Sequence, residues 1–267
     1  MPKPLCVLSL ATALLAALPA RSAEVDCLME PNEVVELSSA VSGLLTEVKV
    51  RRGDRVEAGQ LIARLDSKVE ASTVELLDLR ANSTSVIDAQ RKQLDMVEKR
   101  YNRIATLRNR GVASVSDLDQ VEGERIASQS LLAQAELNRD LAIKELARAK
   151  AALGQREIFS PISGVVALRN LTEGEYVNQD NYVVRIVQLD PLKIEAFVPI
   201  SLFGKVKAGD TAIVHPAAPI EGAYKARVIT VDRVFDAASG TFVVLLEIPN
   251  PDDRLPAGHR CRLEIGG

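Results

Sequence analysis

Two stretches of the chain alternate apolar and polar residues in the way that half-buried β-strands do. In the first, residues 34–66, Val48 and Val50 alternate with charged neighbours, and glycines divide the stretch into short runs. The second, residues 157–188, repeats this alternation of strand and turn. A stretch of this length cannot bury a core alone. The pattern therefore predicts that the two stretches pair to form one small two-sheet sandwich.

The two stretches also match each other residue by residue. SAVSGLLTEVKVRRGDRV lies over SPISGVVALRNLTEGEYV, 121 residues later in the chain. The overlay pairs four glycines that we interpret as turn residues, because glycine readily adopts positive φ: Gly43 with Gly164, and Gly53 with Gly174. Two similar half-motifs so far apart indicate one domain that an insertion has split.

Between the two stretches, in residues 67–156, the apolar positions follow a helical period. Ile87, Leu94 and Tyr101 recur every seven residues, which is the spacing of a heptad seam. Gly111 can end a helix in the left-handed conformation, and a new helix starts shortly after it. We therefore expect an antiparallel α-helical coiled-coil hairpin with two helices of roughly 40 residues each.

Both helix starts have the sequence signature of a capping box. In Ser67–Glu70 and in Ser114–Asp117, the serine hydroxyl is placed to accept a hydrogen bond from the backbone amide three residues on, while the carboxylate reaches back. The second helix has a leucine column in which arginine takes two of the positions: Leu118, Arg125, Leu132, Arg139 and Leu146.

From residue 189 to the end, short apolar runs separated by proline, glycine and aspartate predict five to six further strands. That many short strands in under 80 residues favour a small β-barrel, to which residues 24–33 would add a strand. Cys27 and Cys261 would then lie in the first and last strands of one barrel.

The N-terminus is typical of an export signal. Lys3 precedes an apolar run from Leu5 to Leu18, and small residues follow Ala20, so we assign residues 1–22 to a signal peptide. An uncleaved anchor is the alternative. Export would place the mature protein outside the cytoplasm.

Cleavage would remove Cys6 and leave two cysteines, Cys27 and Cys261. An even number of cysteines in an oxidising compartment favours a disulfide between them. Two buried free thiols are the alternative.

Charge and composition exclude several classes of function. The formal net charge is −3 and no block of Lys and Arg occurs, so nucleic acid is not an expected partner. Aromatic residues make up 3% of the chain and tryptophan is absent, which fits an elongated shape. No nucleophile–base pair, phosphate loop or CxxC occurs, and His215 and His259 lie in unrelated contexts. We therefore expect no catalytic, cofactor-binding or metal-binding residues.

The two half-motifs resemble those of a lipoyl/biotinyl domain. The matches are GxLxxVxVxxGDxVxxGQ from Gly43 to Gln60 and SPxSGxVxxxxxxxGxxV from Ser160 to Val177. With the inserted helices, the chain resembles periplasmic adaptors (membrane fusion proteins of the HlyD type) of tripartite efflux systems. The resemblance implies an α+β fold in which a split lipoyl domain with an inserted α-hairpin precedes a β-barrel. A lipoylated carrier is not expected, because Lys68 falls in the first turn of a helix.

The resemblance also implies the function. Such an adaptor is no enzyme: it links an inner-membrane efflux transporter, with the resistance–nodulation–division (RND) class favoured, to an outer-membrane channel. Its lipoyl domains would stack into a ring, hexameric in the family. We expect the membrane-proximal domain of many members to be missing here. An adaptor of an ABC-type exporter and a pump-independent coiled-coil envelope protein are the alternatives.

One further match lies at the expected hairpin tip. Adaptors of this family that dock onto the channel carry an arginine, a leucine four residues on, and a serine seven after that. Arg103, Leu107 and Ser114 have this spacing. Leu107 would enter an apolar groove, Arg103 would bond to carbonyls or carboxylates, and Ser114 would cap the next helix. Read without the resemblance, the same residues are seam packing, a surface charge and a cap.

Overall fold

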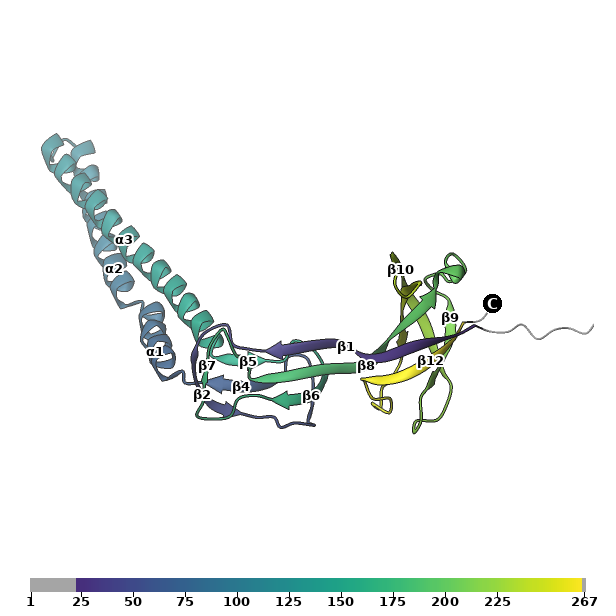
Figure 1. The fold of residues 1–267 in the computed structure, drawn as a ribbon. Helices are drawn as coiled ribbons and strands as arrows, with labels where there is room; N and C mark the ends of the chain where they lie inside the picture. The colour runs from purple at the N-terminus through teal and green to yellow at the C-terminus, as the bar shows by residue number, and fades with distance from the viewer. Residues whose placement is uncertain (1–22, 266–267) are drawn as a thin grey trace, which may run out of the picture. The chain divides into compact units, whose positions relative to one another are not determined.

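The computed structural model describes residues 23–265 (Figure 1). The predicted signal peptide and Cys6 lie outside these residues. The chain divides into two compact units. One comprises residues 35–186, and the other combines the chain before residue 35 with the chain after residue 186.

The unit of residues 35–186 contains a β-sandwich that both half-motifs build. The first half supplies β2 (Gly43–Val48), β3 (Arg55–Val56) and β4 (Leu61–Leu65), and the second supplies β5 (Glu157–Phe159), β6 (Gly164–Arg169) and β7 (Tyr176–Val177). One sheet has the order β5-β4-β2-β7, so the two strands of the first half are flanked on each side by a strand of the second half. β3 pairs with β6 in the other sheet.

The contacts between the halves are reciprocal at the 121-residue offset. Gly53 N donates to Val166 O and Gly174 N donates to Leu45 O, both at 2.8 Å. The strand pairs repeat in the same way: Val56 lies opposite Gly164 in β3–β6, as Val177 lies opposite Gly43 in β2–β7. The two half-motifs are therefore related by pseudo-twofold symmetry, and each pairs its strands with those of the other half.

The core of the sandwich follows the same rule. Its buried residues fall into matched positions of the two halves, apart from Val50 and Ile158, whose counterparts Leu171 and Leu37 are only partly buried. The matched pairs are Leu45 with Val166, Val56 with Val177, Ile62 with Val183, Ala63 with Val184, and Leu65 with Ile186. Each half thus supplies part of one shared core, and neither half has a core of its own.

Of the four glycines interpreted as turn residues, two are turns and two are not. Gly53 and Gly174 have φ of +93° and +89°, which L-residues rarely adopt. Gly43 and Gly164 instead begin strands β2 and β6 with no left-handed φ, so the turn interpretation is wrong for them.

The insertion, which we call the helical segment (residues 68–154), contains three helices: α1 (Lys68–Asn82), α2 (Ser85–Asn109) and α3 (Val115–Gly154). Ion pairs Arg100–Glu124 at 2.8 Å and Arg91–Glu136 at 3.4 Å connect α2 to an antiparallel α3. Lys68 is the first residue of α1.

The expectation of two helices of roughly 40 residues is wrong for the first arm. α3 has 40 residues, but the first arm is broken into helices of 15 and 25 residues at Ser83, whose backbone is extended. The residues around the break, Asn82, Ser83 and Thr84, are short and polar, and such side chains are unfavourable in helix interiors because they can bond to nearby backbone in non-helical conformations. These residues end α1 without a proline or glycine.

The other unit is a β-barrel of mostly antiparallel strands. Its strands are β1 (Ala23–Leu37), β8 (Val184–Pro199), β9 (Thr211–Pro216), β10 (Tyr224–Asp236), β11 (Thr241–Ile248) and β12 (His259–Ile265), with a 3-10 turn η1 (Ile200–Leu202). They follow the order β1-β12-β9-β10-β11-β8, and pairing of β1 with β8 closes the ring. The division between the two units falls within β1 and β8.

Cys27 and Cys261 lie opposite each other on the first and last strands of the barrel. They are register partners in β1–β12 and are joined in a disulfide with a Cα–Cα distance of 4.9 Å. Both are 4% exposed and belong to the barrel core. The bond links the two ends of the described chain, 234 residues apart.

We predict that replacing both Cys27 and Cys261 by alanine lowers the free energy of unfolding by about 2–5 kcal/mol, because the unfolded chain loses a long covalent loop. Denaturant titration of the variant against the oxidised protein measures the loss. Non-reducing peptide mapping should recover Cys27 joined to Cys261. Two alkylatable thiols in protein taken from its native compartment would contradict the bond.

Candidate functional site

The far end of the helical segment is a tight connection between α2 and α3; we call residues 102–115 the tip. Gly111 has φ of +75° and follows the end of α2. Val112 N donates to Leu107 O at 3.0 Å, and Gly111 N donates to Arg108 O at 2.9 Å. These two bonds form a Schellman motif, which satisfies the last carbonyls of α2 and turns the chain.

Ser114 begins α3 with the capping box that the sequence predicts. Its Oγ accepts from Asp117 N at 3.1 Å, and its own N donates to Asp117 Oδ2 at 3.0 Å. Its hydroxyl also donates to Asp117 Oδ2 at 2.6 Å. These hydrogen bonds from Ser114 lower the pKa of the Asp117 carboxyl below its ordinary value of 3.8.

Arg103 and Leu107 lie one turn apart on α2 and face the same open depression. This depression has a volume of about 420 Å³, and Asn102 and Thr106 complete its lining. Leu107 is 38% exposed. Within residues 23–265, no ion pair or side-chain hydrogen bond involves Arg103. An exposed leucine beside an unpaired guanidinium offers apolar surface and free donors to a partner.

Ser114 does not line this depression, and its hydroxyl is engaged by Asp117. The structure thus brings Arg103 and Leu107 together and gives Ser114 the role of a helix cap. Sequence reasoning missed Val112 and Val115, which flank Ser114 and are 73% and 57% exposed. The signal was present, because two apolar residues occur in a connection where polar residues are usual.

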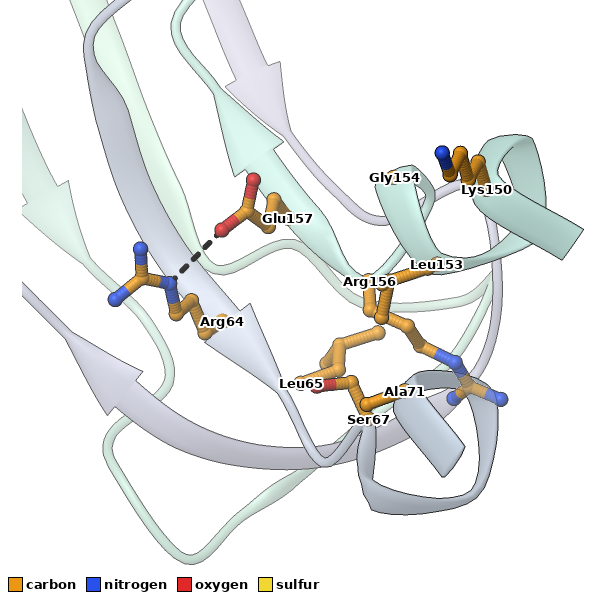
Figure 2. Close-up of a pocket in the computed structure, with 9 residues that line it drawn as sticks. All are labelled: Arg64, Leu65, Ser67, Ala71, Lys150, Leu153, Gly154, Arg156 and Glu157. Carbon is orange, nitrogen blue, oxygen red and sulfur yellow. Dashed lines mark hydrogen bonds and ion pairs between the residues drawn. The ribbon is translucent and has the colours of Figure 1, made fainter. Parts of the chain in front are cut away.

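The opposite end of the helical segment adjoins the sandwich, and a second depression of about 410 Å³ lies there (Figure 2). It is lined by Arg64, Leu65, Ser67, Ala71, Lys150, Leu153, Gly154, Arg156 and Glu157. Each of its cations already has a carboxylate partner: Arg64 has Glu157 at 3.0 Å, Lys150 has Asp78 at 3.8 Å, and Arg156 has Glu70 at 2.5 Å. Because these charges are paired, we interpret this end as a structural joint.

The capping box predicted at this end does not form. Ser67 makes no side-chain hydrogen bond to the start of α1. Glu70, the residue expected to reach back to Ser67, pairs instead with Arg156. Asp66 supplies part of a cap, since its Oδ1 accepts from Lys68 N at 3.3 Å. An ion pair with a residue far away in the sequence therefore takes the place of the capping bond between Ser67 and Glu70.

Within residues 23–265, no three His, Cys, Asp or Glu side chains gather so as to hold a metal ion. Over the same residues, no helix combines the length and apolarity needed to cross a membrane. His215 faces Glu264 at 3.4 Å and His259 faces the carbonyl of Ala217 at 2.8 Å.

The capping box at the tip is predicted to weaken in acid. Because the folded protein lowers the pKa of Asp117, the stability that this carboxylate contributes is present above its unfolded pKa and is lost as pH falls through the folded value. NMR titration should therefore give Asp117 a pKa below 3.8, and Ser114→Ala should raise it toward that value. An unchanged pKa in Ser114→Ala would contradict this cause.

Comparison with known proteins gives the family of the chain. A family model described as "CzcB-like, barrel-sandwich hybrid domain" matches residues 33–188. The pyoverdine export membrane fusion protein PvdR of Pseudomonas aeruginosa is 27% identical over 68% of this chain and 47% of its own length. The nickel-cobalt-cadmium resistance protein NccB of Alcaligenes xylosoxydans is 26% identical over 78% of this chain and 49% of its own length.

Among solved structures, MacA from Actinobacillus actinomycetemcomitans has the same fold. The two align with a TM-score of 0.77 at 22% identity, over 92% of this chain and 78% of the MacA chain. The chain spans about half the length of the curated relatives that it matches. Since the family model covers more than half of the chain, the protein belongs to the membrane fusion proteins with a CzcB-like barrel-sandwich hybrid domain.

Proposed function

We propose that this membrane fusion protein is a periplasmic adaptor that links an inner-membrane efflux transporter to an outer-membrane channel. The observation that carries the proposal is the unpaired Arg103 beside the exposed Leu107 at the tip. The names of two relatives support it, because PvdR is named for pyoverdine export and NccB for nickel, cobalt and cadmium resistance.

In this proposal the helical segment works as a coiled-coil hairpin that holds the tip away from the sandwich. The positions of α3 that face the other arm recur at alternating steps of three and four residues, as in a heptad seam. All of them are buried or half-buried: Leu118, Val121, Arg125, Ser128, Leu132, Ala135, Arg139, Ala142, Leu146, Ala149 and Leu153. Arg125 is accommodated because its guanidinium stacks 4.4 Å from the centre of the Tyr101 ring.

At the tip, Leu107 would insert into an apolar groove between helices of the channel. Arg103 would donate to carbonyls or carboxylates at the rim of that groove, since its guanidinium has no partner within the described chain. Ser114 would act indirectly, by holding the start of α3. Val112 and Val115 would enlarge the apolar contact.

Copies of the protein would associate side by side into a ring, which we propose to be hexameric. Exposed apolar residues on the outer faces of the helices support such packing: Val69, Leu76 and Leu79 on α1, and Ile126, Leu137 and Leu141 on α3. The ring would surround a conduit for the exported compound. Nothing in this role requires catalysis or a cofactor.

The compartment and the transporter complete the proposal. A disulfide between Cys27 and Cys261 suits an oxidising compartment such as the periplasm. We propose an RND transporter as the inner-membrane partner, with an ABC-type exporter as the competing one. Identification of the transporter that is crosslinked to the protein in cells separates the two.

We predict that Leu107→Asp or Arg103→Asp lowers export-dependent resistance about tenfold or more, because a charge in the groove or a lost donor weakens a central contact. The measurement is growth against a panel of antibiotics and divalent metals, restricted to those to which a deletion strain is more sensitive. Thermal unfolding should match the unsubstituted protein, since both residues are exposed.

Matched controls come from the same helix. Met96 is 57% exposed and Lys92 is exposed, and neither lies at the tip. Met96→Asp and Lys92→Asp introduce the same carboxylate and should leave resistance unchanged. Normal resistance in both tip variants would refute docking through the tip.

A further inference from the structure

Helix α1 is held in place by little apolar burial. Of its 15 residues only Ala81 is buried, at 2% exposed. Three of its larger apolar side chains, Val69, Leu76 and Leu79, are 75%, 51% and 69% exposed, and the other two, Val74 and Leu77, are only half-buried. A helix of this length is marginal in water without tertiary support. The break at Ser83 also prevents α1 from drawing stability from a continuous α2.

An arginine contacts α1 at each end: Arg156, from the turn that follows α3, and Arg139, from α3 itself. In the first turn, Glu70 Oε1 accepts from Arg156 Nη2 at 2.5 Å. In the last turn, the carbonyl of Ala81 accepts from Arg139 Nε at 3.3 Å. These are the ends at which a helix favours a carboxylate and a cation, respectively. Side chains of Arg156 and Glu70 are 23% and 21% exposed, so water screens this pair less than the surface pairs of α2.

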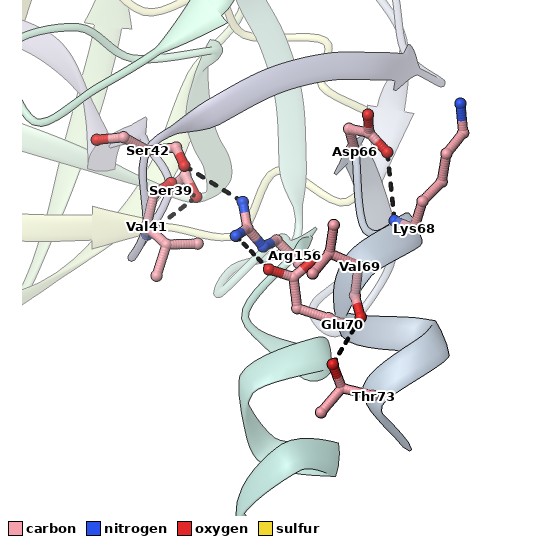
Figure 3. A network of polar contacts seen from close by, with 9 residues as sticks. All are labelled: Ser39, Val41, Ser42, Asp66, Lys68, Val69, Glu70, Thr73 and Arg156. Atoms are coloured by element: carbon pink, nitrogen blue, oxygen red, sulfur yellow. Dashed lines mark hydrogen bonds and ion pairs between the residues drawn. The ribbon is translucent and has the colours of Figure 1, made fainter. Parts of the chain in front are cut away.

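Arg156 also contacts the half of the sandwich that precedes the insertion (Figure 3). Its Nη1 donates to the carbonyl of Ser42 at 3.3 Å, just before β2. Its own carbonyl accepts from Leu65 N at 2.8 Å, at the end of β4. One residue therefore connects the start of α1, the loop before β2 and the end of β4.

The guanidinium of Arg156 also lies close to Gly43. A Cβ added to Gly43 would lie 3.0 Å from Arg156 Nη1, and the backbone there is not left-handed. The glycine thus leaves room for the guanidinium of Arg156 and does not serve a left-handed turn.

We propose that Arg156 is the positioning residue that fixes α1 to the sandwich and so sets where the helical segment begins. Its planar guanidinium donates from two nitrogens to two acceptors in different parts of the chain, which a lysine ammonium cannot reproduce with the same geometry. The inference concerns contacts within the protein and involves no partner. It can therefore fail or hold independently of the proposed docking function.

The test is amide hydrogen exchange on the full-length Arg156→Gln variant. Loss of both contacts should make the α1 amides exchange about three- to tenfold faster, while α2 and sandwich amides stay within about twofold of the original protein. Arg148→Gln is the matched control, because Arg148 is exposed on α3 and makes no ion pair within residues 23–265. It should leave α1 unchanged.

Two further variants identify the contacts. Glu70→Gln should accelerate hydrogen exchange of the α1 amides and of no other element. The double variant with Arg156→Gln should exchange little faster than either single variant, because both substitutions remove the same ion pair. Gly43→Ala should accelerate α1 exchange by a smaller factor than Arg156→Gln, because the added Cβ would displace Arg156 Nη1 from the carbonyl of Ser42. If Arg156→Gln does not fold, Arg156→Lys keeps the charge and should accelerate α1 by a smaller factor.

Three results would overturn the proposal. Unchanged α1 exchange in Arg156→Gln would reduce the pair to a surface contact without consequence. Equal acceleration of α1, α2 and the sandwich would show a general loss of stability and no positioning role. An α1 unaffected by Arg156→Lys, in a protein whose Arg156→Gln variant does not fold, would show that charge alone suffices.

Discussion

The reciprocal hydrogen bonds between the two half-motifs are the interaction on which the rest of the structure depends. Gly53 N to Val166 O and Gly174 N to Leu45 O join halves that are separated by the whole helical segment. Because neither half has a core of its own, closing the sandwich is the only way for either to bury its apolar face. Closure also brings the end of β4 beside the start of β5, as the Leu65 N to Arg156 O bond shows, so both ends of the helical segment leave from one place. An insertion with adjacent ends must return on itself, and the antiparallel packing of α2 and α3 follows.

This arrangement separates the two ends of the helical segment by role. At the sandwich end, every cation lining the depression is paired, and Arg156 connects three parts of the chain. At the tip, Arg103 has no partner within the described chain and Leu107 is partly exposed. Charges that stabilise a fold are satisfied internally, whereas a surface meant for a partner keeps its donors free. The contrast favours the tip as the recognition surface and the other end as its support.

Sequence pattern predicted most of the fold because its strongest signals were repeats of fixed spacing. The 121-residue offset indicated that the two stretches form one domain, and the heptad spacing of Ile87, Leu94 and Tyr101 indicated the packed face of α2. The errors came from interactions that sequence spacing does not encode. Glu70 forms no capping bond with Ser67 and pairs instead with Arg156, 86 positions away in the sequence. Gly43 lies close to that same arginine and forms no left-handed turn, and the break at Ser83 falls among short polar side chains without proline or glycine. At the tip, the spacing of Arg103 and Leu107 placed both on one helix face, but the exposure of Val112 and Val115 depended on how the connection folds.

The central claim is that the protein links an inner-membrane transporter to an outer-membrane channel and contacts the channel through its tip. Crosslinking in intact cells, followed by purification through the protein and mass spectrometry, tests this claim most directly. The account predicts that one purification recovers both an inner-membrane transporter and an outer-membrane channel, and that a photo-crosslinker placed at position 107 reaches the channel. Recovery of neither membrane protein, with only copies of this chain crosslinked, would contradict it.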